Sequence, residues 1–558
     1  MAAPPEPSFN QSSANIADEK VDIPSDLEPG KTLRVDDTSS DTIAEGLDHA
    51  VEQNVESQHG HYETRQITTR QGEAKSCKIV CFSTNDPTNP KNWSKARKWT
   101  VTLTLSWVCF AVAFASAVIT PGIVGVVERF DTSDEVALLT ITLFVYGFGI
   151  GRGSTVFTPL VDNFIDSETA LVFSPLSELY GRRIIYLLTF GMAVIFIVPC
   201  AVAQNIETLL VCRAIDGIAM SVPVANIGGS LADMWRPEER GVPMTAFSAA
   251  PFLGPIMGPM IGGFVFENKG WRWLYWLQLI LCGFLFVCMV VLVPETYAPV
   301  ILEKRAKKLR KQTGDDSYVA EHELAQHTFG EIAQIYLARP LRLLVTEPII
   351  TLFAIYAAIL YGLLYMFFVA YPIVFEEGKG YSPGIAGLMF IPISGGIVVG
   401  LIGAPFVNAH YNKLRSQHTS HPPPELRLIP MIWGCWLIPI GVFIFAWTSY
   451  DDLTWVGPCL AGLPIGIGFV FLYNSFNNYI VDAYQHTAAS ALAAKTLVRS
   501  IWGGSTVLFT TQMYHNLNPR WASSLLGFLA LACCFIPIVF YKYGAAIRKH
   551  SKCAYSGE

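Results

Sequence analysis

The sequence predicts an all-α membrane protein in which twelve transmembrane helices form two six-helix bundles, preceded by a disordered N-terminal tail. Apolar runs of roughly 20 residues recur twelve times, and an α-helix of that length crosses ~30 Å of hydrocarbon. Hydrophobic residues make up 51% of the 558 residues and charged residues only 15%, against roughly 25% charged in soluble proteins. A basic, polar segment separates the first six runs from the last six, which is typical of a transporter with its site between two halves.

The chain divides into five segments by composition. Residues 1–97 are rich in Ser, Thr, Asp, Glu and Gln, and such a composition predicts a disordered cytoplasmic tail. The first six runs lie in 98–293, a cytoplasmic linker covers 294–346, the second six runs lie in 347–541, and 542–558 form a second cytoplasmic tail. The first thirty residues hold no apolar core of a cleavable signal, so the first span is expected to direct insertion.

The basic residues of the loops predict the orientation of the spans. Lys and Arg gather after spans 2, 4 and 8, in the linker and after the last span. By the positive-inside rule these loops and both termini are expected to be cytoplasmic. The membrane is expected to be the plasma membrane. The predicted spans lie near 99–123, 134–151, 184–204, 206–230, 243–266, 272–293, 347–375, 384–408, 428–448, 454–481, 487–512 and 521–541.

Span 2 is interrupted by a polar segment before apolar residues resume at 171–176. Its residues Asp162, Asp166 and Glu168 would each cost on the order of a few kcal/mol at mid-membrane depth. The segment is therefore expected to loop out on the cytoplasmic side.

Other classes of protein find little support. The net charge of −6 and the lack of a basic stripe argue against a nucleic-acid partner. The twelve cysteines are scattered, mostly in apolar runs, which favours small buried residues over a disulfide framework or a metal site. Glycines 147, 149, 151 and 153 resemble a nucleotide fingerprint but follow no strand. Without a metal-ligand pair or a nucleophile beside a base, we expect no enzyme, metal or cofactor.

Two motifs place charges where a membrane protein can use them. Glu178, Arg182 and Arg183 lie between spans 2 and 3, where they could form a latch between rocking helix bundles or simply anchor the loop by positive charge. Arg213 and Asp216 lie three residues apart inside span 4 and can pair on one helix face. This pair is either a neutralised structural device, or a site where Asp216 binds and releases a proton under the influence of Arg213.

Span 5 carries a strip of small residues, the most specific local signal in the chain. Its glycines recur every four residues, so that a neighbouring helix backbone can approach one smooth face, and its prolines kink the span. Ordinary small-residue packing is the alternative. The strip consists of Gly254, Pro255, Gly258, Pro259, Gly262 and Gly263.

Spans 7 and 10 are rich in aromatic and amide side chains that could line a cavity for flat amphipathic or cationic compounds. Many aromatic residues in such spans instead face lipid or the membrane interface. Arg499 in span 11 is a further intramembrane charge without an obvious partner. The candidate cavity residues are Tyr361, Tyr365, Tyr473, Asn474, Asn477 and Arg499.

From 86 to about 551, the chain resembles the major facilitator superfamily, in particular its twelve-span fungal drug:proton antiporter branch. The resemblance rests on PLSELYGRR (175–183), RAIDG (213–217), APFLGPIMGPMIGGF (250–264), VPETYAPVILEKRAKKLRK (293–311) and AASALAAKTLVRS (488–500), with EPI (347–349) and YGLLYMFF (361–368). It implies two bundles rocking around a central cavity, with outward drug movement exchanged for inward protons.

The resemblance also implies roles for the motifs. Glu178, Arg182 and Arg183 belong to a gating loop with Asp233 as a partner. Arg213 matches an arginine linked to proton transfer, and the span 5 strip matches one associated with antiporters. The interruption departs from the family, because deleting 153–170 would restore the usual pattern. It looks like a retained short intron or gene-model error, with a true insertion as the alternative.

The function expected from the sequence is proton-coupled efflux of drugs, toxins or secondary metabolites by a monomer in the lipid bilayer. A dedicated exporter of one metabolite or of polyamines is the second interpretation. A third is a membrane protein that transports nothing because the interruption inactivates it.

Overall fold

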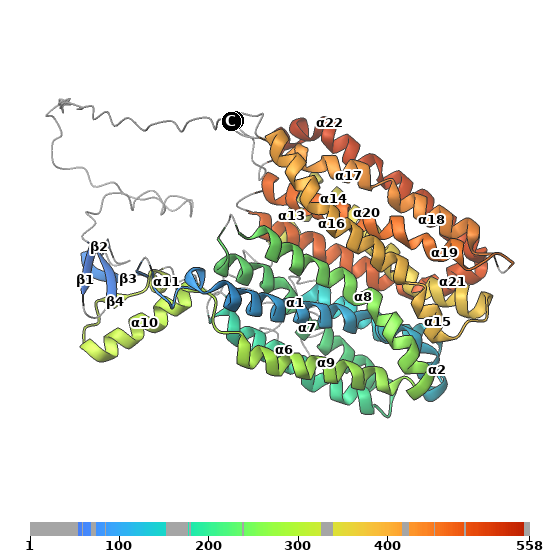
Figure 1. Cartoon of the computed structure of the whole chain (residues 1–558), viewed down its shortest axis with the longest axis horizontal. Coiled ribbons are helices and arrows are strands. Elements are labelled where there is room, and N and C mark those ends of the chain that lie inside the picture. Colours follow the sequence, from blue (N-terminus) through green and yellow to red (C-terminus); the bar gives the residue numbers. More distant parts are fainter. Residues whose placement is uncertain are drawn as a thin grey trace, which may run out of the picture. The chain divides into compact units, whose positions relative to one another are not determined.

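The structure, a computed structural model, consists mainly of long helices that follow the predicted apolar runs (Figure 1). It describes residues 54–57, 60–68, 74–83, 85–151, 177, 180–236, 239–324, 339–415, 423–450, 452–484 and 487–551.

In the N-terminal half, α1 and α7 begin where a side chain caps a free backbone N–H group. The Ser94 hydroxyl accepts a hydrogen bond from the N–H of Arg97 (3.4 Å), and the Asn205 amide oxygen accepts one from the N–H of Thr208 (3.3 Å). The elements are α1 (Lys95–Ala117), η3 (Thr120–Gly122), α2 (Ile123–Phe130), α3 (Asp134–Gly151), α6 (Arg182–Val202), α7 (Ile206–Met234), α8 (Gly241–Lys269) and α9 (Arg272–Leu292).

In the C-terminal half several spans are broken by short turns. The elements are α13 (Arg339–Thr346), α14 (Pro348–Pro372), η5 (Ile373–Gly378), α15 (Pro383–Leu388), α16 (Ile391–Arg415), η6 (Pro424–Leu428), α17 (Ile429–Gly434), α18 (Leu437–Thr448), α19 (Val456–Leu460), α20 (Gly462–Ala483), α21 (Ala488–Cys533) and α22 (Phe535–His550). Asn518, with a φ of 61°, and the following Pro519 kink α21, so the last continuous stretch contains two predicted spans.

Ten helical stretches of the described residues are long and apolar enough to cross a membrane. One of them, Ser490–Gly544, holds the last two predicted spans. The remaining predicted span is α3, which ends at Gly151, where the described residues break off. The segment 153–170, which was predicted to loop out, lies outside the described residues.

Large apolar side chains cover the outer surface of both halves. Exposed examples come from α1, α6, α9, α16 and α17, and water would not tolerate so many of them together. A hydrocarbon surrounding satisfies them, as expected for a protein embedded in the bilayer. They include Trp107, Leu188, Ile280, Phe284, Phe406 and Trp433.

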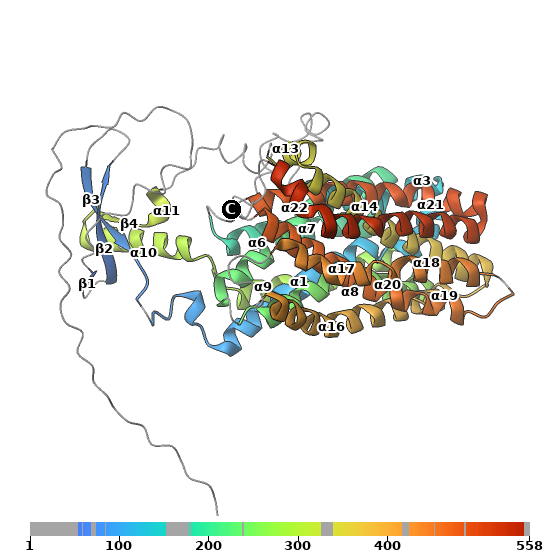
Figure 2. The ribbon, with the colours of Figure 1, turned by 90° about the horizontal axis from the view of Figure 1, so that it is seen from above.

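The two halves lie side by side, with α1, α6, α7, α8 and α9 in one bundle and α14 to α22 in the other (Figure 1). Helix α21 packs against both α14 of its own half and α3 of the other half (Figure 2). We call the end of the bundles from which the linker helix α10 (Ala298–Thr313) leaves the linker side, and the end with α2, α15 and α19 the far side.

A small sheet precedes the first transmembrane helix. Strands β1 (Asn54–Ser57), β2 (Gly60–Thr68) and β3 (Ala74–Val80) pair antiparallel in order. The linker contributes β4 (Tyr318–Val319), which pairs parallel with β3, and a short helix, α11 (Glu321–Leu324). Val80, Tyr318 and residues of α10 bury a small apolar cluster of their own.

The expected disordered tail therefore does not reach residue 97. Polar composition alone missed the strands because their apolar partner surface lies more than two hundred residues later, in the linker. Two ion pairs join the same segments: Lys78 Nζ lies 2.8 Å from the Asp315 carboxylate, and Arg305 pairs with the buried Asp86. Residues 1–53 lie outside the described residues.

Candidate transport site

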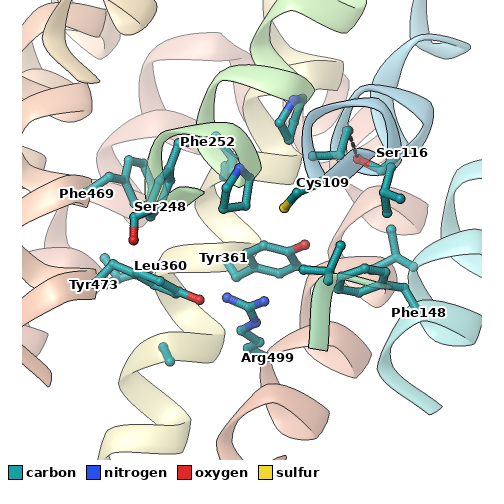
Figure 3. A pocket seen from close by; sticks show the side chains of 18 of the residues that line it. Cys109, Ser116, Phe148, Ser248, Phe252, Leu360, Tyr361, Phe469, Tyr473 and Arg499 are labelled. Atoms are coloured by element: carbon teal, nitrogen blue, oxygen red, sulfur yellow. Dashed lines mark hydrogen bonds between the residues drawn. The ribbon is translucent and has the colours of Figure 1, made fainter. Parts of the chain in front are cut away.

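A cavity of about 210 Å³ lies between the two halves. Side chains from α1, α3, α7 and α8 form one wall, and side chains from α14, α20 and α21 form the other. Most are apolar or aromatic, including Phe148, Phe252 and Phe469 (Figure 3). Such a site, concave and largely apolar with few polar groups, suits a small amphipathic molecule.

Arg499 is the charged residue of this lining, and its side chain is only 8% exposed. Its guanidinium lies 4.6 Å from the ring centre of Tyr361 and 5.5 Å from that of Tyr473. Figure 3 shows the guanidinium pointing into the cavity between these two tyrosines. The Tyr361 hydroxyl in turn lies 3.4 Å from that of Tyr365, which also lines the cavity.

Four of the six predicted cavity residues thus line the cavity: Tyr361, Tyr365, Tyr473 and Arg499. Asn474 lies instead in an adjacent hollow on the linker side, and the described lining of both hollows omits Asn477. Asn477 accepts a hydrogen bond from the buried amine of Lys495. That lysine was missed, although it stands four residues before Arg499 and so shares its helix face.

Access to the cavity differs between its two ends. The adjacent hollow, about 220 Å³ in volume, begins at Ser248, which lines both spaces, and is bounded by the first turns of α8 and by α16 and α20. On the far side the halves touch: the Gly384 N–H donates to Glu267 (3.3 Å), and the Gln512 amide donates to Glu135 (2.7 Å). The cavity is therefore closed on the far side and continues toward the linker side.

Arg213 and Asp216 form a fully buried pair, 3.2 Å apart, as their spacing predicted. Arg213 also donates to the carbonyl oxygens of Thr140 (3.2 Å) and Ala115 (3.0 Å), and so ties α7 to α3 and α1. Gln278 of α9 donates to Asp216 Oδ2 (3.1 Å), whereas Asp216 Oδ1 has no hydrogen-bond partner in the structure.

This pair does not line the cavity but is separated from it by a single ring. The Arg213 guanidinium lies 4.3 Å from the centre of the Phe144 ring, and Phe144 lines the cavity. A change of charge on the pair can therefore reach the cavity by moving one side chain.

On the linker side, Arg182 holds three elements together. Its guanidinium donates to the Ser177 hydroxyl (2.8 Å) and lies 3.5 Å from the carboxylate of Asp233, the predicted partner at the end of α7. The Glu295 carboxylate accepts from the backbone N–H groups of Arg182 (2.9 Å) and Arg183 (3.2 Å).

Sequence reasoning did not single out Glu295, although it lies in the quoted stretch 293–311. The Arg183 side chain donates to the Val290 carbonyl (2.9 Å), which ties it to α9. Glu178 lies outside the described residues.

The glycine strip of α8 allows close helix contacts on two faces. A Cβ on Gly254 would lie 2.6 Å from Ala113 Cβ, and one on Gly262 would lie 2.6 Å from the Val118 carbonyl oxygen, so this face packs against α1. Gly258 meets α1 in the same way. A Cβ on Gly263 would instead lie 2.3 Å from the Pro383 carbonyl oxygen, and one on Gly387 would lie 2.5 Å from the Pro259 carbonyl oxygen.

Within this strip, Pro255 lines the cavity. The strip therefore packs against its own half along one face and touches the other half at the far side. Gly147 belongs to the glycine run that resembles a nucleotide-binding fingerprint but follows no strand. In the structure it allows a close helix contact with the backbone of α7.

Comparison with known proteins places this architecture in a family. The model of the Major Facilitator Superfamily matches residues 105–507. The MFS-type transporter paaT of Penicillium rubens is 54% identical over 87% of this chain and 86% of its own length. The multidrug transporter mdrA of Aspergillus fumigatus is 41% identical over 86% of this chain and 76% of its own length.

Among solved structures, the xylose transporter XylE from E. coli matches with a TM-score of 0.56 at 16% identity, over 80% of this chain and 98% of its own. This likeness concerns the fold. The predicted fold and family are confirmed, and the relatives are transporters rather than enzymes. The chain therefore belongs to the major facilitator superfamily, as a multi-pass membrane transporter of the fungal drug-efflux type.

Proposed function

We propose that the protein is a proton-coupled antiporter that exports drugs, toxins or secondary metabolites from the cytoplasm. In this proposal it acts as a monomer in the plasma membrane, with the linker side and both termini in the cytoplasm. The basic residues of the linker helix, which include Lys304, Lys307, Lys308, Arg310 and Lys311, support this orientation.

The observation that carries the proposal is the free oxygen of a buried acid beside the cavity. Asp216 Oδ1 has no hydrogen-bond partner in the structure, and protonation would give this side chain a neutral form that tolerates burial. A proton on Asp216 weakens the pair, which frees the guanidinium to move against Phe144 and the cavity wall.

Movement of the halves then needs contacts that can break and re-form. The Arg182–Asp233 pair and the Glu295 contacts fix the linker-side ends of α6, α7 and α9 relative to one another. The α8 strip touches the other half through backbone contacts at Gly263 and Pro259 on the far side. Opening on the far side would separate the second set of contacts, as alternating access requires.

A dedicated exporter of one metabolite remains the second candidate, and the small volume of the cavity favours it over a pump for large drugs. Export of polyamines finds no support in the site, because none of the described residues that line the cavity is an acid. An inactive protein would follow if the segment 153–170 prevented span 2 from forming.

Efflux in a pump-deficient yeast tests the proposal. Cells that express the protein should accumulate less of at least one member of a panel of neutral, cationic and anionic fluorescent dyes, and a proton uncoupler should abolish the difference. Asp216→Asn keeps the shape of the side chain but cannot bind a proton near neutral pH, so it should abolish uncoupler-sensitive efflux. The control Asp131→Asn removes the same negative charge from an exposed turn on the far side, and it should leave efflux intact.

Uncoupler-insensitive efflux in the wild type, or full efflux by Asp216→Asn, would refute proton coupling through this residue. A parallel comparison of the chain with and without 153–170 tests the interruption. We expect the shorter form to be the active one. Sequencing the transcript decides whether the segment is retained, and a spliced product that contains it would exclude an intron.

A further inference from the structure

The arginine of the cavity differs from the other buried arginines in having no acidic partner among the described residues. Arg213 pairs with Asp216, Arg548 with Glu425 and Arg182 with Asp233. Arg499 is buried to a similar degree, yet it forms no ion pair with any described residue, and its Nε has no hydrogen-bond partner. A buried cation without an anion is strongly unfavourable in a membrane protein.

The neighbours of Arg499 compensate only part of this charge. The faces of Tyr361 and Tyr473 lie within cation–π distance of the guanidinium, and these rings stabilise a cation without neutralising it. The guanidinium points into the cavity and not away from it (Figure 3). An anion in the cavity could therefore reach a group that is already oriented and largely buried.

A second buried cation increases the positive potential. Lys495 is 2% exposed, and its amine lies 4.5 Å from the centre of the Phe476 ring and 5.1 Å from that of Tyr473, the ring it shares with Arg499. Since none of the described lining residues is an acid, this wall of the cavity presents net positive charge to a ligand.

The rest of the cavity selects for an aromatic ring. Phe148, Phe252 and Phe469 face the space around the guanidinium (Figure 3). A cavity of about 150 Å³ lined by apolar side chains holds a benzene-sized ring. The volume of about 210 Å³ therefore has room for such a ring and one small charged group.

We propose that the substrate is a small amphipathic organic anion, an aromatic ring bearing one carboxylate, and that the carboxylate pairs with the Arg499 guanidinium. The inference rests on the proposed function as an exporter and narrows its substrate class. The cavity determines two groups of the ligand: a planar ring that lies between the phenylalanines and an anionic group that pairs with the guanidinium. The positive wall excludes cationic compounds that the aromatic spans alone would have accommodated.

Binding of three matched probes to the purified protein in detergent tests the inference. Benzoate, benzamide and benzylamine share a ring and differ in charge, and equilibrium dialysis with radiolabelled probes gives each dissociation constant. Benzoate should bind at least about tenfold more tightly than benzamide, as a charged hydrogen-bonded pair provides, and benzylamine should bind most weakly. Equal binding of benzoate and benzamide, or no binding of benzoate, would overturn the inference.

Variants then assign the preference to Arg499. Arg499→Gln should remove the preference for benzoate over benzamide, whereas Arg499→Lys should retain part of it because the charge remains. The control Arg520→Gln removes an arginine that also stacks on a tyrosine, 4.2 Å from the Tyr450 ring centre, but lies outside the cavity lining. It should leave all three constants unchanged. A preference that survives Arg499→Gln in a protein that elutes as the wild type does would contradict the assignment.

The result is separable from that of the proposed function. Binding in detergent needs no proton gradient, so selective binding of benzoate without proton-coupled efflux would refute the coupling and keep the inference. Proton-coupled efflux of a neutral or cationic dye without selective binding of benzoate would do the reverse.

Discussion

Arg213 in the N-terminal half and Arg499 in the C-terminal half are both buried within transmembrane helices, and both stack on aromatic rings. Arg213 is enclosed by Asp216 and by two backbone carbonyl oxygens, outside the lining of the cavity. Arg499 lies in the cavity wall with no described carboxylate beside it. The difference indicates that the first arginine serves the protein's own conformational states, whereas the second is available to a ligand.

Removal of Arg213 should give the largest effect. Arg213→Met leaves Asp216 buried without its cation, which destabilises a protein by about 3–5 kcal/mol. Denaturant unfolding in detergent should show a loss of this size. The double variant Arg213→Met with Asp216→Leu removes both charges and should recover most of it. If the single variant were as stable as the wild type, the pair would be dispensable for the fold.

The packing around α8 should give the next largest effect. Gly254→Ala places a Cβ against Ala113 and the Phe110 carbonyl, and such overpacking destabilises a protein by about 1–3 kcal/mol. Gly283→Ala on α9 is the matched control, because a Cβ there meets nothing within 4 Å. It should stabilise the helix by about 0.5–1 kcal/mol in the same unfolding experiment. Equal effects at both sites would mean that α8 does not pack tightly on α1.

Removal of Arg499 should change stability far less than removal of Arg213. Arg499→Met discards an unpaired charge together with its ring contacts, and we expect the two effects to offset each other to within about 1 kcal/mol. The free energy of unfolding measures this. A loss equal to that of Arg213→Met would break the comparison, since it would make Arg499 a structural residue.

The partly exposed ion pair between Lys78 of β3 and Asp315 of the linker should give the smallest effect. The hydrogen bond from Lys78 lowers the pKa of Asp315 below its ordinary value of 3.8, and the same bond raises the pKa of Lys78 above 10.5. The contribution of Asp315 is therefore complete above about pH 4 and is lost as the pH falls through its lowered pKa. That of Lys78 is complete below its ordinary pKa and is lost only as the pH rises through the raised one.

Hydrogen–deuterium exchange of β3, corrected for intrinsic rates, should thus accelerate below pH 4 and stay constant from pH 5 to 9. Asp315→Asn should reduce the acid-dependent step and leave the part that comes from the Arg305–Asp86 pair, while Glu303→Gln, on the neighbouring linker helix, should preserve the whole step. Unchanged exchange at low pH would show that neither ion pair contributes and that the apolar cluster attaches the sheet.

Sequence patterns were sufficient for features that depend on near neighbours in the chain. Spans follow from runs of apolar residues, the Arg213–Asp216 pair from its spacing of three, and the α8 strip from its spacing of four. Features that depend on distant segments were not predictable. The strands before α1 find their partner in β4, and the ring that separates Arg213 from the cavity comes from α3.

The cavity, too, depends on contacts between distant segments that the sequence did not predict. The sequence gives Arg499 as a charge in span 11, but only the fold brings Tyr361 of α14 and Tyr473 of α20 against it. Asn474 and Asn477 are three residues apart, and both were predicted to line the cavity, but the described lining contains neither. In the structure Asn474 lines the linker-side hollow, and the Asn477 amide oxygen accepts a hydrogen bond from Lys495.

Proton movement measured directly in proteoliposomes tests whether proton binding at Asp216 is coupled to transport through the cavity. A pH-sensitive dye enclosed in the lumen reports protons that cross when a concentration gradient of an exported compound is imposed. The wild-type protein should move protons against the flow of the compound, and Asp216→Asn should bind the compound but move no protons. Equal proton movement by both proteins, or transport by the wild type without any, would contradict the account.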